Sequence, residues 1–274
     1  FPCYARNATT LYEQSKAMAL HGVEPSKVVL TITPESNPEL MAHLDGQHHA
    51  PYLFFTRPTE LSYMSPSEFI TALSIRLRTL PRHACTLPKQ CVCGRLCRTY
   101  GEVIDHAFSC DRMSTFTFTQ RHDMVKAAIA ALIRSYGFNV TIEPRFYSYD
   151  NGLRQRPDIT VNTARPITTD IVICMQDGAV GAAANRAAQI KRRIHNDAVS
   201  RQDHTFIPFA MEVHGHCDES CYDFIKHIRQ HLPPYTGYIF EREAFSLTAI
   251  TLAKARVRSI NGLAATGFDE RFFL

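Results

Sequence analysis

Hydrophobic residues recur every three or four positions in several stretches of the chain, which is the spacing that buries one face of a helix. The first clear stretch covers residues 69–80 and follows a Ser-Pro-Ser-Glu start signal. A longer one begins near residue 119 and ends at Gly137, where a left-handed glycine cap is expected. Further helices are predicted over residues 181–198, 222–232 and 243–263.

Other short stretches carry alternating or continuous hydrophobic residues, as β-strands do. The predicted strands cover residues 139–143, 157–161, 169–174 and 206–213. From the long helix near residue 119 onwards, the order of elements is α-β-β-β-α-β, which is typical of a mixed sheet flanked by helices. We therefore expect an α/β fold, preceded by short helices and proline-containing turns in the first 80 residues.

The composition is that of a globular protein. Of the 274 residues, 45% are hydrophobic and 20% are charged, which excludes a wholly disordered chain, a collagen-like fibre and a coiled coil. No apolar run approaches the roughly 18 residues of a membrane-spanning helix, so we expect a soluble chain with no membrane partner. The chain begins with Phe and shows no signal segment, and we expect it to be a fragment of a longer protein.

Positive charge is concentrated in one predicted helix. The whole chain carries 30 Lys and Arg against 26 Asp and Glu, a net charge of +4. Residues 186–201 contain one acid, Asp197, and five basic residues, which are Arg186, Lys191, Arg192, Arg193 and Arg201. Such a stretch suits a polyanion such as nucleic acid. The alternative is an ordinary solvated helix face.

Cysteine is clustered in the same way. Five of the nine cysteines lie within residues 85–110. In a chain of this length, a dense Cys/His patch indicates metal binding rather than a disulfide scaffold. We therefore expect a reducing compartment, which would be the nucleus or another intracellular one.

Two close pairs of metal ligands stand within this cluster: Cys91 with Cys93, and His106 with Cys110. A structural Zn²⁺ takes four such ligands in a tetrahedron, and Gly94 allows the tight turn that the first pair needs. Because protein would fill all four positions, we expect this Zn²⁺ to support folding rather than catalysis. Cys97 could replace Cys91 or Cys93, and Cys85 is a less favoured alternative.

A weaker group of candidate ligands follows the last predicted strand. Its members are His214, His216, Cys217 and Cys221. Ordinary packing is the favoured explanation, and a second Zn²⁺ is the alternative.

Two aspartates stand at the starts of neighbouring predicted strands. Asp158 begins the strand over residues 157–161, and Asp170 begins the next one twelve positions later. Their carboxylates can converge there, and a divalent cation would relieve the repulsion between them. Mg²⁺ or Mn²⁺ held in this way polarises a phosphate and activates water. The alternative for isolated aspartates at strand ends is turn formation.

The helix predicted over residues 181–198 places Lys191 on a face of small residues. This face consists of Ala184, Ala187, Lys191, Ile194 and Ala198, whereas Arg192 and Arg193 turn aside. A lysine on a packing face needs a partner, and metal-bound carboxylates would be one. Its ammonium could then orient the attacking water or stabilise charge that develops on phosphorus. The alternative is a lysine whose stem extends along the surface to solvent.

The triplet Arg121-His122-Asp123 opens the long helix. It borders the buried stripe at the helix N-terminus, where anions are favoured, so these residues could position a phosphate. Helix capping by Asp123 is an equally good explanation. Glu143 is either an accessory acid or an ordinary strand-end residue.

These motifs together resemble the restriction-like endonuclease domain of site-specific non-LTR retrotransposons, a branch of the PD-(D/E)XK nuclease superfamily. The resemblance covers roughly residues 65–235 and depends on the order and spacing of the motifs. In chain order, the matching pieces are the helix over residues 69–80, the Cys91, Cys93, His106 and Cys110 motif, Arg121-His122-Asp123, Arg156-Pro157-Asp158, Asp170, the helix with Lys191, and residues 206–215.

The resemblance implies metal-dependent cleavage of one strand of a target DNA, which leaves a 3′ hydroxyl that primes reverse transcription. It implies that Asp158 and Asp170 bind Mg²⁺ or Mn²⁺ and that Lys191 is the catalytic lysine, displaced onto the following helix. The sequence departs from the family at Val172, where a D-x-K strand would hold its lysine, and at His195, in a region where the family often has Tyr. The alternative function, which Val172 favours, is an inactive, domesticated nucleic-acid-binding module within a larger ribonucleoprotein.

The implied partners are DNA, with RNA or a DNA–RNA hybrid as alternatives, and a reverse transcriptase or other domains of the same polyprotein. The residues expected to contact nucleic acid are Arg121, His122, Arg156, Arg192 and Arg193. The chain would then divide into a helical N-terminal linker region (1–84), a zinc-binding module (85–118), a restriction-like endonuclease core (119–240) and a C-terminal helical extension (241–274).

Overall fold

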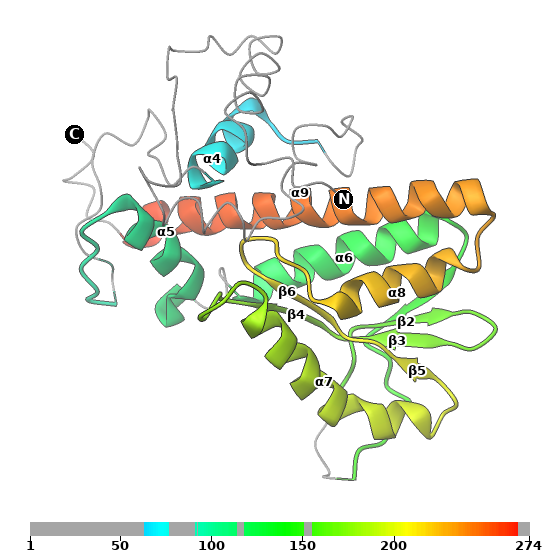
Figure 1. The fold of residues 1–274 in the computed structure, drawn as a ribbon. Helices are drawn as coiled ribbons and strands as arrows, with labels where there is room; N and C mark the ends of the chain where they lie inside the picture. Colours follow the sequence, from blue (N-terminus) through cyan, green and yellow to red (C-terminus); the bar gives the residue numbers. More distant parts are fainter. Residues whose placement is uncertain (1–62, 77–90, 92, 114–117, 151–154, 268–274) are drawn as a thin grey trace.

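The fold is known from a computed structural model, which describes residues 63–76, 91, 93–113, 118–150 and 155–267. Within these residues the expected mixed α/β architecture is confirmed, because helices pack on a small mixed sheet (Figure 1). The turns expected before residue 63, and Cys85, lie outside the described residues.

Most helices lie where the hydrophobic pattern predicts them. Their bounds are Pro66–Arg76 (α4), Tyr100–Ser109 (α5), Asp111–Met113 (a 3₁₀ turn, η1), Gln120–Ser135 (α6), Ala182–Ser200 (α7), Glu219–Arg229 (α8) and Pro234–Gly267 (α9). Helix α5 was not predicted, although Thr99 caps it by accepting a hydrogen bond from the Glu102 amide at 3.2 Å. Helix α9 starts nine residues before the predicted 243.

Two of the predicted strands are each interrupted. The observed strands are Asn139–Ile142 (β1), Ile159–Asn162 (β2), Ile167–Thr169 (β3), Ile171–Cys174 (β4), Thr205–Phe206 (β5) and Phe209–Glu212 (β6). The order β1-β2-β3-β5 forms one sheet and β4-β6 forms another, so the strand predicted over residues 169–174 divides at Asp170. Pro208, which has no N–H to donate, separates β5 from β6.

Hydrogen bonds nevertheless continue through both interruptions. The amides of Thr205, Ile207 and Phe209 donate in turn to the carbonyls of Pro166, Thr168 and Asp170, at 2.9 to 3.0 Å. The chain that runs from β3 to β4 therefore stays paired, in parallel, with the chain that runs from β5 to β6. On its other side β3 pairs antiparallel with β2, and β2 with β1.

The helices cover the strands in layers (Figure 1). Helix α7 packs against β4, β5 and β6, while α6 packs against β1 and β4, and α8 against β6. Helix α9 lies over α6 and α8 as a further layer, and it also contacts α4 and α5. As a result, α6 and α7 approach the interruption at Asp170 from different elements of the fold.

The buried side chains form two main clusters, and α9 contributes to both. The larger cluster lies between the strands, α6, α8 and α9, and includes Phe240 and Leu247. The second joins α4 and α5 to α9 through residues such as Ile75, Phe108 and Val257. Helix α9 thus contributes buried side chains to both cores.

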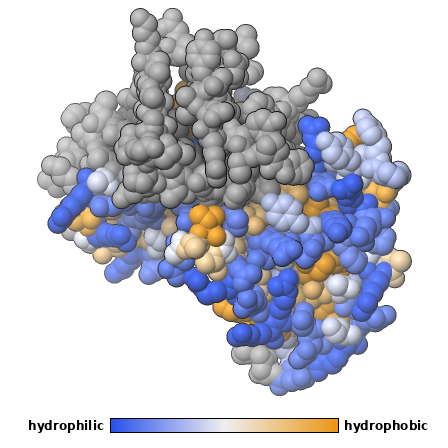
Figure 2. Space-filling model, in the orientation of Figure 1, coloured by the Kyte–Doolittle hydropathy of each residue, from blue (hydrophilic) through white to orange (hydrophobic). Residues whose placement is uncertain are grey.

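Among the described residues, no helix is long and apolar enough to cross a bilayer. Hydrophilic side chains dominate the visible described surface, with hydrophobic side chains in small groups between them (Figure 2).

Candidate metal centres

The four cysteine and histidine residues predicted as metal ligands lie together. One ligand atom from each of Cys91, Cys93, His106 and Cys110 lies within 4.8 Å of those of the other three. The Cys91 and Cys110 sulfurs are 3.8 Å apart, and the Cys93 sulfur is 3.3 Å from His106 Nε2. Three of these residues are buried, and Cys93 is exposed. This Cys/His cluster could hold one metal ion.

Local structure positions each pair of ligands. Gly94 has a φ of 89°, a left-handed conformation, and its amide donates to the Cys91 carbonyl at 2.8 Å. This turn places Cys91 and Cys93 side by side. His106 and Cys110 stand four residues apart at the end of α5, and therefore on one side of that helix.

The other candidate ligands lie elsewhere. Cys97 is buried, and its thiol donates to the Glu102 carbonyl, at a sulfur–oxygen distance of 3.8 Å, so it does not replace Cys91 or Cys93. Within the described part of the chain, the group of His214, His216, Cys217 and Cys221 does not bring its ligand atoms within 4.8 Å of one another. The Cys221 thiol donates a hydrogen bond to the Ala210 carbonyl at 3.0 Å, which agrees with a role in ordinary packing.

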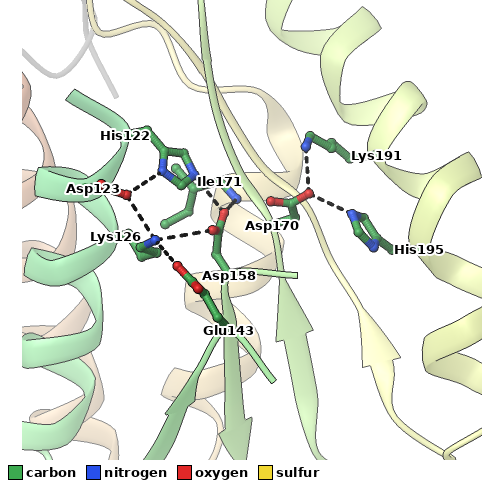
Figure 3. Close-up of polar contacts among 9 residues, drawn as sticks. All are labelled: His122, Asp123, Lys126, Glu143, Asp158, Asp170, Ile171, Lys191 and His195. Atoms are coloured by element: carbon green, nitrogen blue, oxygen red, sulfur yellow. Dashed lines mark hydrogen bonds and ion pairs between the residues drawn. The ribbon is translucent and has the colours of Figure 1, made fainter. Parts of the chain in front are cut away.

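A second group of candidate ligands lies at the interruption of the strands (Figure 3). Glu143 follows β1, Asp158 precedes β2, and Asp170 separates β3 from β4. Backbone hydrogen bonds hold these ends together: Glu143 N donates to Asp158 O at 2.8 Å, and Asp158 N donates to Thr169 O at 3.0 Å. Both aspartates are buried, with 6% and 4% of their surface exposed. Two buried carboxylates thus meet at one edge of adjacent strands.

His122 completes this group from the first turn of α6. One ligand atom from each of His122, Asp158 and Asp170 lies within 4.8 Å of the others. The Nε2 atom of His122 is 2.9 Å from Oδ2 of Asp158, and the same oxygen accepts the Ile171 amide at 2.7 Å. We call these three residues the carboxylate site.

The pKa values of the two aspartates are shifted in opposite directions. Burial and the neighbouring Asp170 raise the pKa of Asp158, while the hydrogen bond with His122 opposes this shift. Burial also disfavours the charge on Asp170, but hydrogen bonds with His195 and Asp158 and the charge of Lys191 outweigh it and lower its pKa. Without a cation, Asp158 therefore holds a proton more readily than Asp170 does. A bound cation would allow both carboxylates to be charged.

Lys191 lies at the carboxylate site, as the pattern predicted. Its Nζ is 2.7 Å from Oδ2 of Asp170, and 28% of its side chain remains exposed. The buried face of α7 differs in detail from the prediction: His195 is buried, whereas Ile194 is only half-buried. His195 Nε2 lies 2.7 Å from the same Asp170 oxygen.

Sequence reasoning missed a second lysine on the opposite side of the carboxylate site. Lys126, one turn after His122 on α6, places its Nζ 2.8 Å from Glu143, 3.0 Å from Asp123 and 3.8 Å from Asp158. Hydrogen bonds with Glu143 and Asp123 outweigh its burial and raise the pKa of Lys126, so it stays charged. The spacing of four residues between His122 and Lys126 was the only sequence signal for it.

The arginines expected to contact nucleic acid are placed differently from one another. Arg156 and Arg193 are exposed, and Arg192 is half-buried. Arg121 does not border the buried stripe of α6 but belongs to it, with 1% of its surface exposed. Its guanidinium lies 5.5 Å from the centre of the Phe118 ring, and none of its nitrogens has a hydrogen-bond partner among the described residues. Arg121 is therefore removed from any surface contact.

No protein-family model matches the chain, and no curated protein matches its sequence.

Proposed function

We propose that the protein is a metal-dependent endonuclease that hydrolyses phosphodiester bonds in DNA. The observation that supports this most strongly is the convergence of Asp158, Asp170 and Lys191, which come from two strand ends and a helix. Lys191 and Asp170 are 2.7 Å apart, and the carboxylate site brings its ligand atoms within 4.8 Å of one another. In metal-dependent cleavage of a phosphodiester, the cation activates water and a nearby ammonium stabilises the charge that develops on the phosphate.

The carboxylate site fits a divalent cation. Oxygen ligands such as those of Asp158 and Asp170 suit Mg²⁺ and Mn²⁺, and the imidazole of His122 favours the softer of the two, Mn²⁺. A cation held there would polarise a phosphodiester and lower the pKa of a bound water. We therefore expect Mn²⁺ to support at least as much activity as Mg²⁺.

The residues of the chain would supply the remaining parts of the reaction. Lys191 is partly exposed and lies beside Asp170, so its ammonium can reach a phosphate at the carboxylate site and stabilise the charge that develops on it. Arg156 and Arg193 are exposed and can contact neighbouring phosphates of the DNA backbone. His122, with 29% of its side chain exposed, can contact either the cation or the substrate.

The arrangement of elements also supports a PD-(D/E)XK core. Three antiparallel strands lead to the carboxylate site, and a parallel pair continues beyond it, with helices α6 and α7 on either side of that site. Val172 lies on β4, where the family would have its lysine, but Lys191 brings an ammonium to Asp170 from α7. A lysine displaced onto the helix would compensate for Val172.

We infer separately that the Cys/His cluster holds a structural Zn²⁺. In a tetrahedral site with Zn–S bonds of about 2.3 Å, two sulfurs lie about 3.8 Å apart. This matches the 3.8 Å between the sulfurs of Cys91 and Cys110. The four side chains would leave no ligand position open for water, so the ion would stabilise the fold and take no part in hydrolysis.

The test is nicking of supercoiled plasmid DNA by the purified protein in Mg²⁺ or Mn²⁺. We expect conversion to the open circular form, and a rate lowered on the order of 100-fold or more by Asp158→Ala or Lys191→Ala. The matched controls are Asp177→Ala and Lys226→Ala, because both residues are exposed and lie outside the carboxylate site. These control variants should nick at the wild-type rate.

Two results would contradict the proposal. If Asp158→Ala nicks as fast as the wild type, the carboxylate site is not the catalytic one. If the wild type binds DNA but does not nick it in either metal, the protein is the inactive nucleic-acid-binding module that Val172 suggests.

A further inference from the structure

Two polar side chains behind Asp170, the buried His195 and the half-buried Tyr149, have no part in the function proposed above. His195, on α7, is 2% exposed, and its Nε2 is 2.7 Å from Oδ2 of Asp170. Its Nδ1 is 2.6 Å from the hydroxyl of Tyr149, which lies between β1 and β2. The chain from Tyr149 through His195 to Asp170 thus joins three separate elements at a candidate metal ligand.

The direction of the hydrogen bonds follows from the chemistry of the two ends. A carboxylate that binds a cation is ionised, and an ionised carboxylate can only accept hydrogen bonds. Nε2 of His195 must therefore carry a proton. Burial and the charge of Asp170 raise the pKa of Tyr149 to about 12, so its hydroxyl keeps its proton. In the tautomer that carries its proton on Nε2, Nδ1 accepts from the Tyr149 hydroxyl while Nε2–H donates to Asp170.

This arrangement determines which oxygen of Asp170 is available. Oδ2 accepts from both Lys191 and His195, each at 2.7 Å. The other oxygen points toward Asp158 and the interior of the carboxylate site (Figure 3). Donors on α7 therefore occupy one oxygen of Asp170 and direct the other toward the place where a cation would bind.

We propose that His195 and Tyr149 are positioning residues, which fix the rotation of the Asp170 carboxylate so that one oxygen serves the metal ion and the other holds Lys191. This inference rests on the proposed function, because it assigns the two residues to the same carboxylate site. Groups that orient a metal ligand in this way commonly change metal affinity by about 10- to 100-fold when removed.

If His195 and Tyr149 only supported the fold, their replacement would lower stability without a specific loss of metal affinity. His195 also packs against the Phe206 ring, with 5.1 Å between the ring centres, so its replacement affects packing as well as hydrogen bonding. Tyr149→Phe avoids this difficulty, because it removes only one hydroxyl and leaves His195 in place. The chain offers a close control in Tyr147, two residues earlier. Its buried hydroxyl bonds to Thr168 at 2.6 Å and to His204 at 2.7 Å, and it does not contact Asp170.

The experiment measures Mn²⁺ affinity by isothermal titration of the Zn²⁺-loaded protein, together with thermal unfolding and plasmid nicking. We expect Tyr149→Phe to weaken Mn²⁺ binding about 10-fold. Tyr147→Phe should lower the melting temperature but change Mn²⁺ affinity less than twofold. His195→Gln, which keeps a donor for Asp170, should bind Mn²⁺ more tightly than His195→Phe does.

Equal Mn²⁺ affinity in Tyr149→Phe and Tyr147→Phe would overturn the positioning role while leaving the nuclease proposal intact. A folded His195→Phe variant with wild-type affinity would do the same. If the wild type itself binds no Mn²⁺ beyond the Zn²⁺ site, both this inference and the proposed function are wrong. If the wild type binds Mn²⁺ but does not nick DNA, the affinity comparison still decides the positioning role.

Discussion

The placement of Arg121 is difficult to reconcile with a stable fold. A guanidinium that is buried without a hydrogen-bond partner among the described residues is costly, and burial lowers its pKa to about 10. Its position in the first turn of α6 adds a further cost, because the positive end of the helix dipole lies there. The cation–π contact with the Phe118 ring offsets only part of this unfavourable free energy.

We therefore expect Arg121→Met to stabilise the protein, by about 1–4 kcal/mol if it behaves like other replacements of buried charge by apolar groups. Thermal or urea unfolding would measure the change. The control is Arg134→Met on the same helix, which removes a 3.0 Å hydrogen bond to the Val140 carbonyl and should be neutral or destabilising. A loss of stability in Arg121→Met larger than in the control would mean that Arg121 has an anionic partner.

Glu212 is another buried residue with an ionisable side chain, and it should make the folding stability depend on pH. Its Oε1 accepts the Gly181 amide at 2.9 Å, and none of its surface is exposed. Burial raises its pKa above the ordinary value of 4.5, although the amides at the start of α7 and the charge of Arg186 oppose the shift. The Cys174 thiol also interacts with Glu212, and burial together with the Glu212 charge raises the pKa of this thiol to about 11.

The sign of the effect follows from proton binding. Just above pH 4.5 the folded protein still holds the Glu212 proton while the unfolded chain has lost it, so stability falls as the pH rises through this window. Above the raised pKa the loss is complete. Urea midpoints measured from pH 4.5 upwards should therefore fall more steeply for the wild type than for Glu212→Gln, whose amide does not titrate. Parallel curves would show that Glu212 does not couple folding to protons.

At the scale of elements, the start of α7 controls the placement of Lys191 and His195. Gly181 caps this helix with a φ of 84°, and a Cβ there would lie 2.5 Å from Nε2 of His216. Gly178, three residues earlier, has a similar φ of 82°, but a Cβ at that position would have no neighbouring atom within 4 Å among the described residues. Both glycines avoid the cost of a left-handed side chain, but only Gly181 also avoids a collision.

We expect Gly181→Ala to cost more stability than Gly178→Ala, by on the order of 1 kcal/mol or more. Both variants share the backbone cost, so the difference between them measures the collision with His216. Chemical denaturation of the two variants gives this difference directly. Equal destabilisation would mean that His216 moves aside without cost.

At the scale of the whole molecule, the two hydrophobic clusters predict an uneven response to metal removal. The Cys/His cluster lies in the part of the structure where α4 and α5 pack against α9, and Cys91 and Cys110 belong to that apolar cluster themselves. The strands around the carboxylate site belong to the other cluster. Loss of the metal should therefore loosen one part of the molecule more than the other.

We expect about one Zn²⁺ per chain, by elemental analysis, and its loss in Cys110→Ala. Hydrogen exchange after chelation should show faster exchange across Tyr100–Ser109 (α5), while Ile159–Asn162 (β2) keeps its protection. The opposite pattern, with β2 exposed first, would contradict the division into two cores. A metal-free protein of unchanged stability would refute the Zn²⁺ assignment.

Helix α9 shows how far hydrophobic periodicity could predict the fold. It runs over Pro234–Gly267 and is buried around most of its circumference between residues 244 and 257. A helix packed on all sides has no polar stripe, so its bounds are weakly marked in the sequence. The strand interruptions were missed for a related reason: residues 169–174 read as one apolar run, and only pairing with two different neighbours divides it at Asp170.

The sequence by itself determined three features, because each depends on residues close together in the chain. These are the types of the main elements, the position of Asp158 and Asp170 at strand ends, and the spacing of the Cys/His ligands Cys91, Cys93, His106 and Cys110. The tertiary structure decided which distant side chains meet. Tyr149 reaches His195 across 46 positions, and Lys126 reaches Glu143 across 17. Such pairs depend on how helices pack on strands, and no local pattern of hydrophobic and polar residues specifies that packing.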